Sequence, residues 1–434
     1  MSNLNEMKEK GDSKRLLCLT GYGVVIGILV GVLISVYRKL VVLMQTEMVG
    51  FYASAKSSIL YFLLAIFVVA LLGFIVGKLT EKEPMIGGSG IPQVAGQLKG
   101  IMNVNWKRVL PFKFIGGLIG LASGLTVGRE GPSVQMGASL GQAFADLSGK
   151  DEEDKKLFIT AGAAAGLSAA FNAPLSGLVF ALEELHQKFD KYIFLIAAAS
   201  AFLADYISGL FFGSKPVIDV GQIVELPANK YIYIILLAII VGFLSQYFIK
   251  GIYNVKRLYQ KLDLPVYAKV MIPFLVTALV VIFIPDLFGS GEHFIFLSVG
   301  ENISTSKQLA LLAVKFLLLL LAFCSGMPGG IFLPMLVLGS LIGNIFASIM
   351  VSMGLLGSEY ILICSLIAMA ANFSAIVRSP ITATLLIVEM TGAFTYLLPL
   401  GLGVMVSYLA IEMLNIKPVY EMLLEIMVGK GRYK

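Results

Sequence analysis

The chain has 434 residues, of which 58% are hydrophobic and 14% are charged, and its formal net charge at pH 7 is +6. A soluble protein carries roughly a quarter charged residues to keep its surface wet, so this composition excludes a water-soluble globule of this size. The small basic excess is typical of the loop bias of membrane proteins and does not indicate nucleic-acid binding.

Apolar runs that reach or approach the roughly 20 residues needed to span a hydrocarbon core follow one another along the chain. In chain order they are Leu16–Tyr37, Ile59–Val76, Tyr231–Ile249, Val270–Ile284 and Leu309–Phe323. The first run is too long for a signal-peptide core and has no convincing cleavage site after it, so we expect a retained helix. These features predict an all-α polytopic membrane protein.

Short basic ends flank the apolar part of the chain. We expect residues 1–15 to form an N-terminal segment, residues 16–420 a single transmembrane domain, and residues 421–434 a C-terminal tail. The basic residues at the two ends are Lys8, Lys10, Lys14, Arg15, Lys430, Arg432 and Lys434. Because lysine and arginine accumulate on the cytoplasmic side, we expect both termini in the cytoplasm of a multi-pass protein of the cell (plasma) membrane.

The cysteines and histidines do not indicate a catalytic or metal centre. Cys18, Cys324 and Cys364 are isolated in apolar surroundings, which favours structural thiols. His186 and His293 are the only histidines, and the chain has neither an HExxH motif nor a Cys/His cluster. An intramembrane enzyme would need a nucleophile or metal constellation. We therefore expect a protein that is not an enzyme, with no metal and no cofactor.

The chain contains an internal repeat. Ser123–Pro132 and Ser325–Pro334 are glycine-rich segments separated by an offset of 202 residues, and the similarity continues beyond both prolines. The identities at this one offset are Ser123/Ser325, Gly124/Gly326, Gly128/Gly330, Pro132/Pro334, Gly137/Gly339 and Gly141/Gly343.

Two further blocks repeat in the same order. Ala165–Glu183 matches Ala371–Glu389 at an offset of 206, and Gly88-Ser-Gly90 matches Gly289-Ser-Gly291 at an offset of 201. We therefore expect two copies of one fold, with repeat one at about 16–212 and repeat two at about 230–420. Repeated transporters commonly bind their substrate near mid-membrane, between broken helices.

The repeated blocks carry signals for helices that begin inside the membrane. Gly128–Pro132 and Gly329–Pro334 interrupt apolar stretches, and a proline in the first turn favours a helix start, as at Asn172-Ala-Pro174 and Ser379-Pro380. Helix packing would explain one such glycine-rich segment, but it explains matched pairs poorly. Each helix start carries roughly half a positive charge and free N–H groups. Several starts together predict an anion site that binds weakly enough to release its ion.

Comparing the copies separates shared from unshared acidic residues. Glu183 and Glu389 are repeat mates, which indicates a common structural role such as tying a helix end to a neighbour. Glu184 has Met390 as its mate, so its carboxylate exists in one copy only. A proton-transfer role and a simple helix-end charge are both open for Glu184.

Glu130 is the second unshared acid, since its repeat mate is Phe332. An acidic residue at a helix start within the membrane is a functional candidate by default, and an ion pair with the adjacent Arg129 is the structural alternative. When ionised, such a carboxylate occupies an anion site; when protonated, it leaves that site to chloride. Proton movement and anion occupancy are thereby coupled.

Four ordered motifs resemble those of the CLC chloride channel/transporter family, over nearly the whole chain. They are Gly88-Ser-Gly-Ile-Pro92, Gly128-Arg-Glu-Gly-Pro132, Gly330-Ile-Phe-Leu-Pro334 and the late tyrosine in Lys417-Pro-Val-Tyr420, with further similarity from Phe171 through Glu184. The resemblance implies two inverted-topology repeats with broken and re-entrant helices, and a homodimer with one pathway in each subunit.

The resemblance also implies residue roles. Chloride is bound by the hydroxyls of Ser89 and Tyr420 and by the backbone N–H groups of Ile331 and Phe332. Glu130 is the external gate, and Glu184 is the internal proton-transfer residue. The supporting motif residues are Gly88, Gly90, Pro92, Gly128, Arg129, Gly131, Pro132, Gly330 and Pro334. From the residues alone, Ser89 is equally a helix cap and Tyr420 an interfacial aromatic.

The expected function is secondary active exchange of chloride for protons. A passive chloride channel is the alternative, disfavoured because channel members generally lack an ionisable residue matching Glu184. A fluoride exporter departs from the GSGIP pattern, and nitrate-selecting relatives often carry proline where Ser89 stands. The cytoplasmic nucleotide-binding modules of many relatives are not expected after Tyr420. Lys113 has no obvious acidic partner nearby in the sequence.

Overall fold

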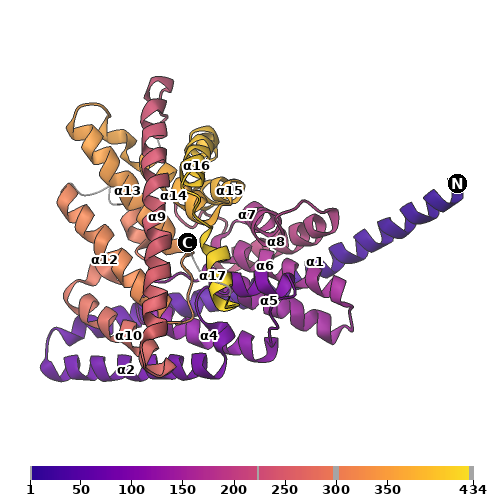
Figure 1. The fold of residues 1–434 in the computed structure, drawn as a ribbon, viewed down its shortest axis with the longest axis horizontal. Helices are drawn as coiled ribbons and strands as arrows, with labels where there is room; N and C mark the ends of the chain where they lie inside the picture. Colours follow the sequence, from indigo (N-terminus) through magenta and orange to yellow (C-terminus); the bar gives the residue numbers. More distant parts are fainter. Residues whose placement is uncertain (1, 222–223, 297–302, 430–434) are drawn as a thin grey trace.

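The computed structural model describes residues 2–221, 224–296 and 303–429, and it is almost entirely helical over these residues (Figure 1). The helices are α1 (Ser2–Ala55), α2 (Ile59–Lys82), α3 (Ile91–Leu98), α4 (Trp106–Ala122), α5 (Glu130–Leu147), α6 (Glu152–Phe171), α7 (Pro174–Phe180), α8 (Lys191–Phe212), α9 (Tyr231–Lys261), α10 (Val266–Phe283), α12 (Thr305–Cys324), α13 (Phe332–Ser352), α14 (Ile361–Val377), α15 (Pro380–Thr391), α16 (Leu397–Glu412) and α17 (Val419–Met427). Short 3₁₀ turns include η4 (Pro285–Leu287) and η5 (Glu292–Phe296), and η2 (Ala181–His186) is a π-helix.

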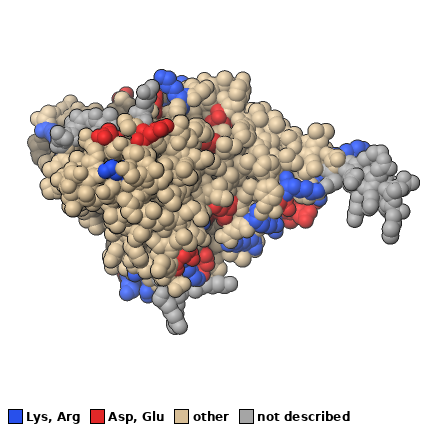
Figure 2. All heavy atoms as spheres, turned by 90° about the horizontal axis from the view of Figure 1, so that it is seen from above, with Lys and Arg blue, Asp and Glu red and all other residues tan. Residues whose placement is uncertain are grey.

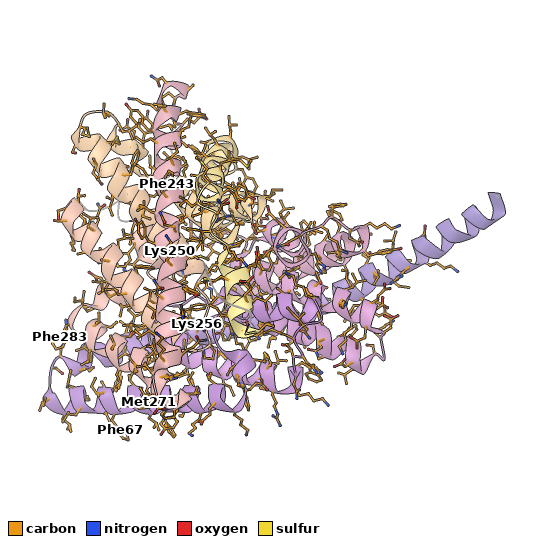
Figure 3. The ribbon with its side chains drawn as sticks, in the orientation of Figure 1. Phe67, Phe243, Lys250, Lys256, Met271 and Phe283 are labelled. Carbon is orange, nitrogen blue, oxygen red and sulfur yellow. The ribbon has the colours of Figure 1, made fainter. Side chains whose placement is uncertain are left out.

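Nine helices of the described residues are long and apolar enough to cross a membrane. Large side chains such as Phe67, Phe243 and Phe283 project from the outside of the molecule (Figure 3). On the face in Figure 2, acidic and basic residues gather in a few small groups, several of them mixed, on a largely uncharged surface. Uncharged apolar surface of this extent suits hydrocarbon rather than water, so the prediction of a polytopic membrane protein is confirmed.

The broken helices begin where the proline signals place them. α7 and α15 start at Pro174 and Pro380, where a proline needs no intrahelical hydrogen bond. α5 and α13 start at Glu130 and Phe332, two residues before the motif prolines. α3 starts at Ile91, immediately before Pro92 of the first motif.

Two shared carboxylates tie the repeats together. Glu183, just beyond the end of α7, accepts hydrogen bonds from the N–H groups of Ile381 and Thr382 in the first turn of α15. Glu389, near the end of α15, accepts the equivalent bonds from Leu175 and Ser176 in the first turn of α7. Each helix end therefore lies beside the start of its repeat mate, so α7 and α15 run antiparallel. The structural role predicted for both acids is confirmed, and the repeats have inverted topology.

Each repeat also contains a buried lysine bonded to a glycine-containing loop. Lys113 donates from Nζ to the carbonyl oxygens of Ile86 and Gly88, at 2.7 and 2.6 Å. Its repeat mate Lys315 donates to Leu287 and Gly289, at 2.8 and 2.7 Å. The partners of Lys113 are thus backbone carbonyls, which no search for acidic residues would find.

The glycine-rich loops of the two repeats meet at the centre of the fold. Gly128 and Gly330 exchange backbone hydrogen bonds, each with an N–O distance of 2.7 Å. The carbonyl oxygen of Gly88 accepts from the N–H of Gly329 at 3.1 Å. These contacts bring the starts of α3, α5 and α13 into one region.

Two predicted boundaries fall inside helices. α1 continues through residue 15 without a break, because its polar first turns lead directly into the first apolar run. α17 starts after Pro418 and extends to Met427, burying Met422 and Leu423 beyond Tyr420. The side chains of Lys8 and Lys10, and the residues Lys430, Arg432 and Lys434, lie outside the described part of the chain.

Candidate functional site

Glu130 is the first residue of α5 and is completely buried. Its side chain folds back over Gly128, beside the backbone N–H of Leu333 in α13. Neither carboxylate oxygen makes a hydrogen bond of normal geometry. A buried carboxylate without a partner is costly, and here it lies against two helix starts that favour negative charge. The structural alternative for Glu130, an ion pair with the adjacent Arg129, is not found among the described residues, where Arg129 lies nearer to Glu292.

Ser89 and Tyr420 supply two buried hydroxyl groups close to the same helix starts. Each residue is 2% exposed, and neither hydroxyl has a hydrogen-bond partner of normal geometry. The Ser89 hydroxyl packs against Gly131, where any side chain would collide with it. Both structural alternatives are wrong: Gly90, not Ser89, is the residue preceding α3, and Tyr420 is buried rather than interfacial.

Ile331 and Phe332 form the start of α13, and both are buried. Backbone N–H groups at a helix start have no intrahelical acceptor, so they are available to an anion. The ring of Phe332 lies between Phe171 and Phe373, with centroid distances of 5.3 and 4.4 Å. This packing fixes the backbone from which the two N–H groups project.

Glu184 lies in the π-helix η2 and is partly buried. Its Oε2 accepts a hydrogen bond of 2.7 Å from Ser379 Oγ, the residue before α15. Glu184, Ser89 and Glu130 are all electrostatic neighbours of the Tyr420 hydroxyl. Both unshared acids therefore lie within electrostatic range of one tyrosine, while Glu183 next to Glu184 binds the start of α15.

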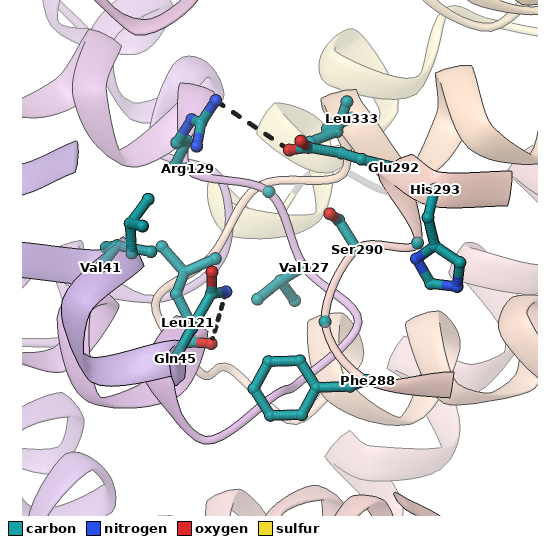
Figure 4. Close-up of a pocket in the computed structure, with 14 residues that line it drawn as sticks. Val41, Gln45, Leu121, Val127, Arg129, Phe288, Ser290, Glu292, His293 and Leu333 are labelled. Carbon is teal, nitrogen blue, oxygen red and sulfur yellow. Dashed lines mark hydrogen bonds and ion pairs between the residues drawn. The ribbon is translucent and has the colours of Figure 1, made fainter. Parts of the chain in front are cut away.

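A cavity of about 200 Å³ borders the loop that carries Glu130 (Figure 4). Its wall includes Gly128 and Arg129 from repeat one, together with Ser290, Glu292 and Leu333 from repeat two. Arg129 Nη2 lies 4.0 Å from Glu292 Oε1 across this cavity. Our reading of the sequence missed Glu292, although the comparison of copies would have found it, since its position follows Gly289-Ser-Gly291 and its mate is an isoleucine.

The arrangement is suited to a small anion. Three helix starts, two unpartnered hydroxyls and the N–H groups of α13 converge without a fully charged cation in direct contact with the hydroxyls. Such a site gives partial positive charge from several directions and avoids the tight binding of a paired charge. Within the described ranges, no three His, Cys, Asp or Glu side chains are placed to hold a metal ion.

Comparison with known proteins gives the same family from sequence and structure. The family model described as "Voltage gated chloride channel" matches residues 72–412. The H(+)/Cl(-) exchange transporter ClcA of Salmonella schwarzengrund (strain CVM19633) is 33% identical over 423 residues, covering 95% of this chain and 89% of its own. A second ClcA, from Salmonella paratyphi B, is 34% identical over 412 residues, covering 92% of this chain and 86% of its own.

Solved structures are similar over the same extent. The structure of a slow cyanobacterial Cl-/H+ antiporter superposes with a TM-score of 0.88 at 28% identity, covering 95% of this chain and 98% of that one. A CLC-type fluoride/proton antiporter gives a TM-score of 0.78 at 22% identity, covering 93% and 97% of the two chains, and at this identity it supports the fold alone. The family match over most of the chain, and the curated relatives above 30% identity, show that the chain belongs to the voltage gated chloride channel (CLC) family.

Proposed function

We propose that this protein exchanges chloride for protons across the cell membrane. The observation that carries the proposal is the convergence of the buried, unpartnered groups of Ser89, Tyr420 and Glu130 at the starts of α5 and α13. The curated relatives are named H(+)/Cl(-) exchange transporters, and the solved structure that is 28% identical is that of a Cl-/H+ antiporter, which supports the same reaction. These relatives are transporters, not enzymes.

Chloride in this proposal binds between the hydroxyls of Ser89 and Tyr420 and the N–H groups of Ile331 and Phe332. The carboxylate of Glu130, when ionised, lies at the helix starts and excludes chloride from the outer position. Protonation removes its charge, so chloride replaces it there. One proton is therefore taken up or released each time the carboxylate and the anion exchange places.

Glu184 is proposed to carry protons on the opposite side of Tyr420. Its hydrogen bond from Ser379 holds the carboxylate at the start of α15, away from the N–H groups that Glu183 occupies. Protons and chloride then use separate routes on the Glu184 side and share the region around Glu130. The second repeat has Met390 in place of this acid, which fits a proton-transfer residue that serves only one side of the membrane.

The placement in the cell follows from the same proposal. Residues 16–420 form the transport domain, with repeat one at about 16–212 and repeat two at about 230–420. Both termini lie in the cytoplasm, Glu130 faces the outside, and Glu184 faces the inside of the plasma membrane. The functional unit is a homodimer with one pathway in each subunit.

Proton movement in sealed liposomes tests the exchange directly. Purified protein is reconstituted with an imposed chloride gradient and an electrical shunt, and internal pH is followed. Uphill proton movement that needs both protein and the chloride gradient is the expected result. Chloride flux without proton movement would mean a passive channel, and Glu184 would then be only a charge at a helix end.

A further inference from the structure

The cavity beside Arg129 is separate from the groups assigned to chloride binding and proton transfer. It is lined by Gly128 and Arg129 at the start of α5 and by residues 288–293 of the second repeat (Figure 4). Neither Ser89, Tyr420 nor Glu184 contributes to its wall. It therefore offers a place for an ion before the ion reaches Glu130.

Arg129 is the unusual group in this cavity. Its side chain is 12% exposed, its Nε is buried without a hydrogen-bond partner, and its one close carboxylate within the described residues is Glu292, at 4.0 Å. A guanidinium has five N–H donors, and leaving them unmet in a buried position is unfavourable. A distance of 4.0 Å is too long for a hydrogen bond, so Glu292 balances the charge without satisfying the donors.

A second polar group faces the same space. Ser290 is the repeat mate of Ser89 and lines the cavity from the Gly289–Gly291 loop. Lys315 fixes that loop through the carbonyl of Gly289, as Lys113 fixes the Ser89 loop through Gly88. The inverted repeats thus present one serine-bearing loop at the site of Ser89 and Tyr420 and another at this cavity.

The geometry points to an anion-binding station in this cavity, in which Arg129 and Ser290 bind the ion and Glu292 competes with it for Arg129. The inference rests on the proposed function, because chloride is the anion that this station would deliver to Glu130. Glu292 acts as a tethered carboxylate: its side chain is 41% exposed, so it can turn to solvent when an anion takes its place. It sets how strongly the pathway attracts chloride without touching the central site.

The expected size of the competition is small. The pair is weak because its closest N–O distance is 4.0 Å and Glu292 is 41% exposed, and weak ion pairs at a protein surface change an equilibrium by roughly two- to fivefold. Glu292→Gln should therefore lower the chloride concentration that half-fills the station by about that factor. A weak competitor suits a transporter, since a permanent strong pair would keep the anion out.

Modification of a thiol in the cavity measures occupancy without any transport. Ser290→Cys is introduced in a Cys18→Ser background, because Cys18 is the exposed cysteine of the described residues and Cys324 and Cys364 are buried. The rate of reaction with a neutral methanethiosulfonate reagent is measured in purified protein at increasing chloride, with gluconate as the replacing anion. Chloride should slow the reaction.

Further variants test whether competition between Glu292 and chloride for Arg129 sets the chloride concentration that protects the thiol. Glu292→Gln should shift protection to about two- to fivefold lower chloride. Asp286→Asn, which removes an exposed acid from the preceding turn outside the cavity wall, should leave it unchanged. In an Arg129→Gln background, Glu292→Gln should cause no shift, and Arg129→Met, which also lacks the positive charge, replaces Arg129→Gln if the latter protein does not fold.

The outcomes are distinct from those of the exchange assay. No chloride protection of the introduced thiol, an equal shift with Asp286→Asn, or a shift that persists without Arg129 would each overturn the station while leaving exchange intact. Protection that shifts as expected in a protein that moves no protons would support the station and overturn the exchange mechanism.

Discussion

The carboxylates of Glu130 and Glu184 differ in what surrounds them. Glu130 is buried at two helix starts without a hydrogen-bond partner of normal geometry, whereas Glu184 accepts one bond from Ser379. In the proposed mechanism the Glu130 carboxylate exchanges places with an anion, because no hydrogen bond of normal geometry holds either of its oxygens. In the same proposal the Glu184 carboxylate keeps its place, held by Ser379, while its proton is gained and lost.

Replacing Glu130 by Gln should abolish proton coupling and retain chloride movement. The amide has nearly the shape of the carboxyl group and never ionises, so it imitates the protonated state permanently. Proton and chloride fluxes measured in the same liposomes check this expectation. Uphill proton movement persisting in this variant would remove Glu130 from the proton route.

Replacing Glu184 by Gln should leave chloride flux largely intact while proton flux is lost. Ser379 can still donate its hydrogen bond to the amide oxygen, so local structure is preserved. The matched control is Glu421→Gln in α17, an exposed acid one residue from Tyr420. If that control lost proton transport equally, general charge rather than the position of Glu184 would be responsible.

The sequence alone points to some of the proposed site residues and not to others. Glu130 and Glu184 are identified by comparing the repeats, because asymmetry in an otherwise repeated pattern marks a specialised position. Ser89 and Tyr420 are not, since the former has a serine mate and the latter is one aromatic among many; only the family motifs select them. The carbonyl partners of Lys113 are set by loop geometry, which composition does not reveal.

At the scale of helices, the reciprocal bonds of Glu183 and Glu389 are the main link between α7 and α15. Each carboxylate accepts two backbone N–H bonds and one hydroxyl bond from the facing helix start, the hydroxyls being those of Thr382 and Ser176. Charge-assisted bonds at a helix start stabilise both the start and the contact between helices.

Glu389→Gln and Glu183→Gln should each destabilise the protein by about 1–2 kcal/mol, because a neutral amide caps a helix start less well than a carboxylate. Thermal unfolding in detergent should show similar decreases for the two variants, since their contacts are equivalent. Glu389→Gln should keep the ratio of chloride to protons. A large difference between the variants in unfolding temperature would contradict the equivalence.

Helix positions were largely predictable and helix lengths were not. Pro174 and Pro380 mark their helix starts because a proline lacks the N–H group that an interior position needs. α1 runs through residue 15 although its first turns are polar, and α17 continues past residue 420, where Met422 and Leu423 are buried; hydropathy alone predicts neither.

Over the whole molecule, neither repeat is complete without the other. The hydrogen bonds between Gly128 and Gly330, and from Gly329 to Gly88, satisfy backbone groups of one repeat with groups of the other. Unpaired backbone at membrane depth costs several kcal/mol per group, so a single repeat would leave these loops unsatisfied.

Dividing the chain between the repeats should therefore be tolerated only if both pieces are present. Residues 1–225 and 226–434, produced together, should copurify and exchange chloride for protons, because the break lies outside every helix of the described residues. Either piece alone should aggregate during size-exclusion chromatography in detergent. A single piece that remained monodisperse and well folded would show that the contacts between repeats are not needed for folding.

The reciprocal caps of α7 and α15 have a consequence for ion traffic. Five helices, α3, α5, α7, α13 and α15, begin with a partial positive charge from their peptide dipoles. At α7 and α15 this charge is already balanced by the carboxylates of Glu389 and Glu183. The starts of α7 and α15 therefore do not compete for an anion, and the starts of α3, α5 and α13 remain available to bind it. By neutralising these two helix starts, Glu183 and Glu389 would restrict the anion of the proposed mechanism to one route, although neither residue is part of the proposed chloride site.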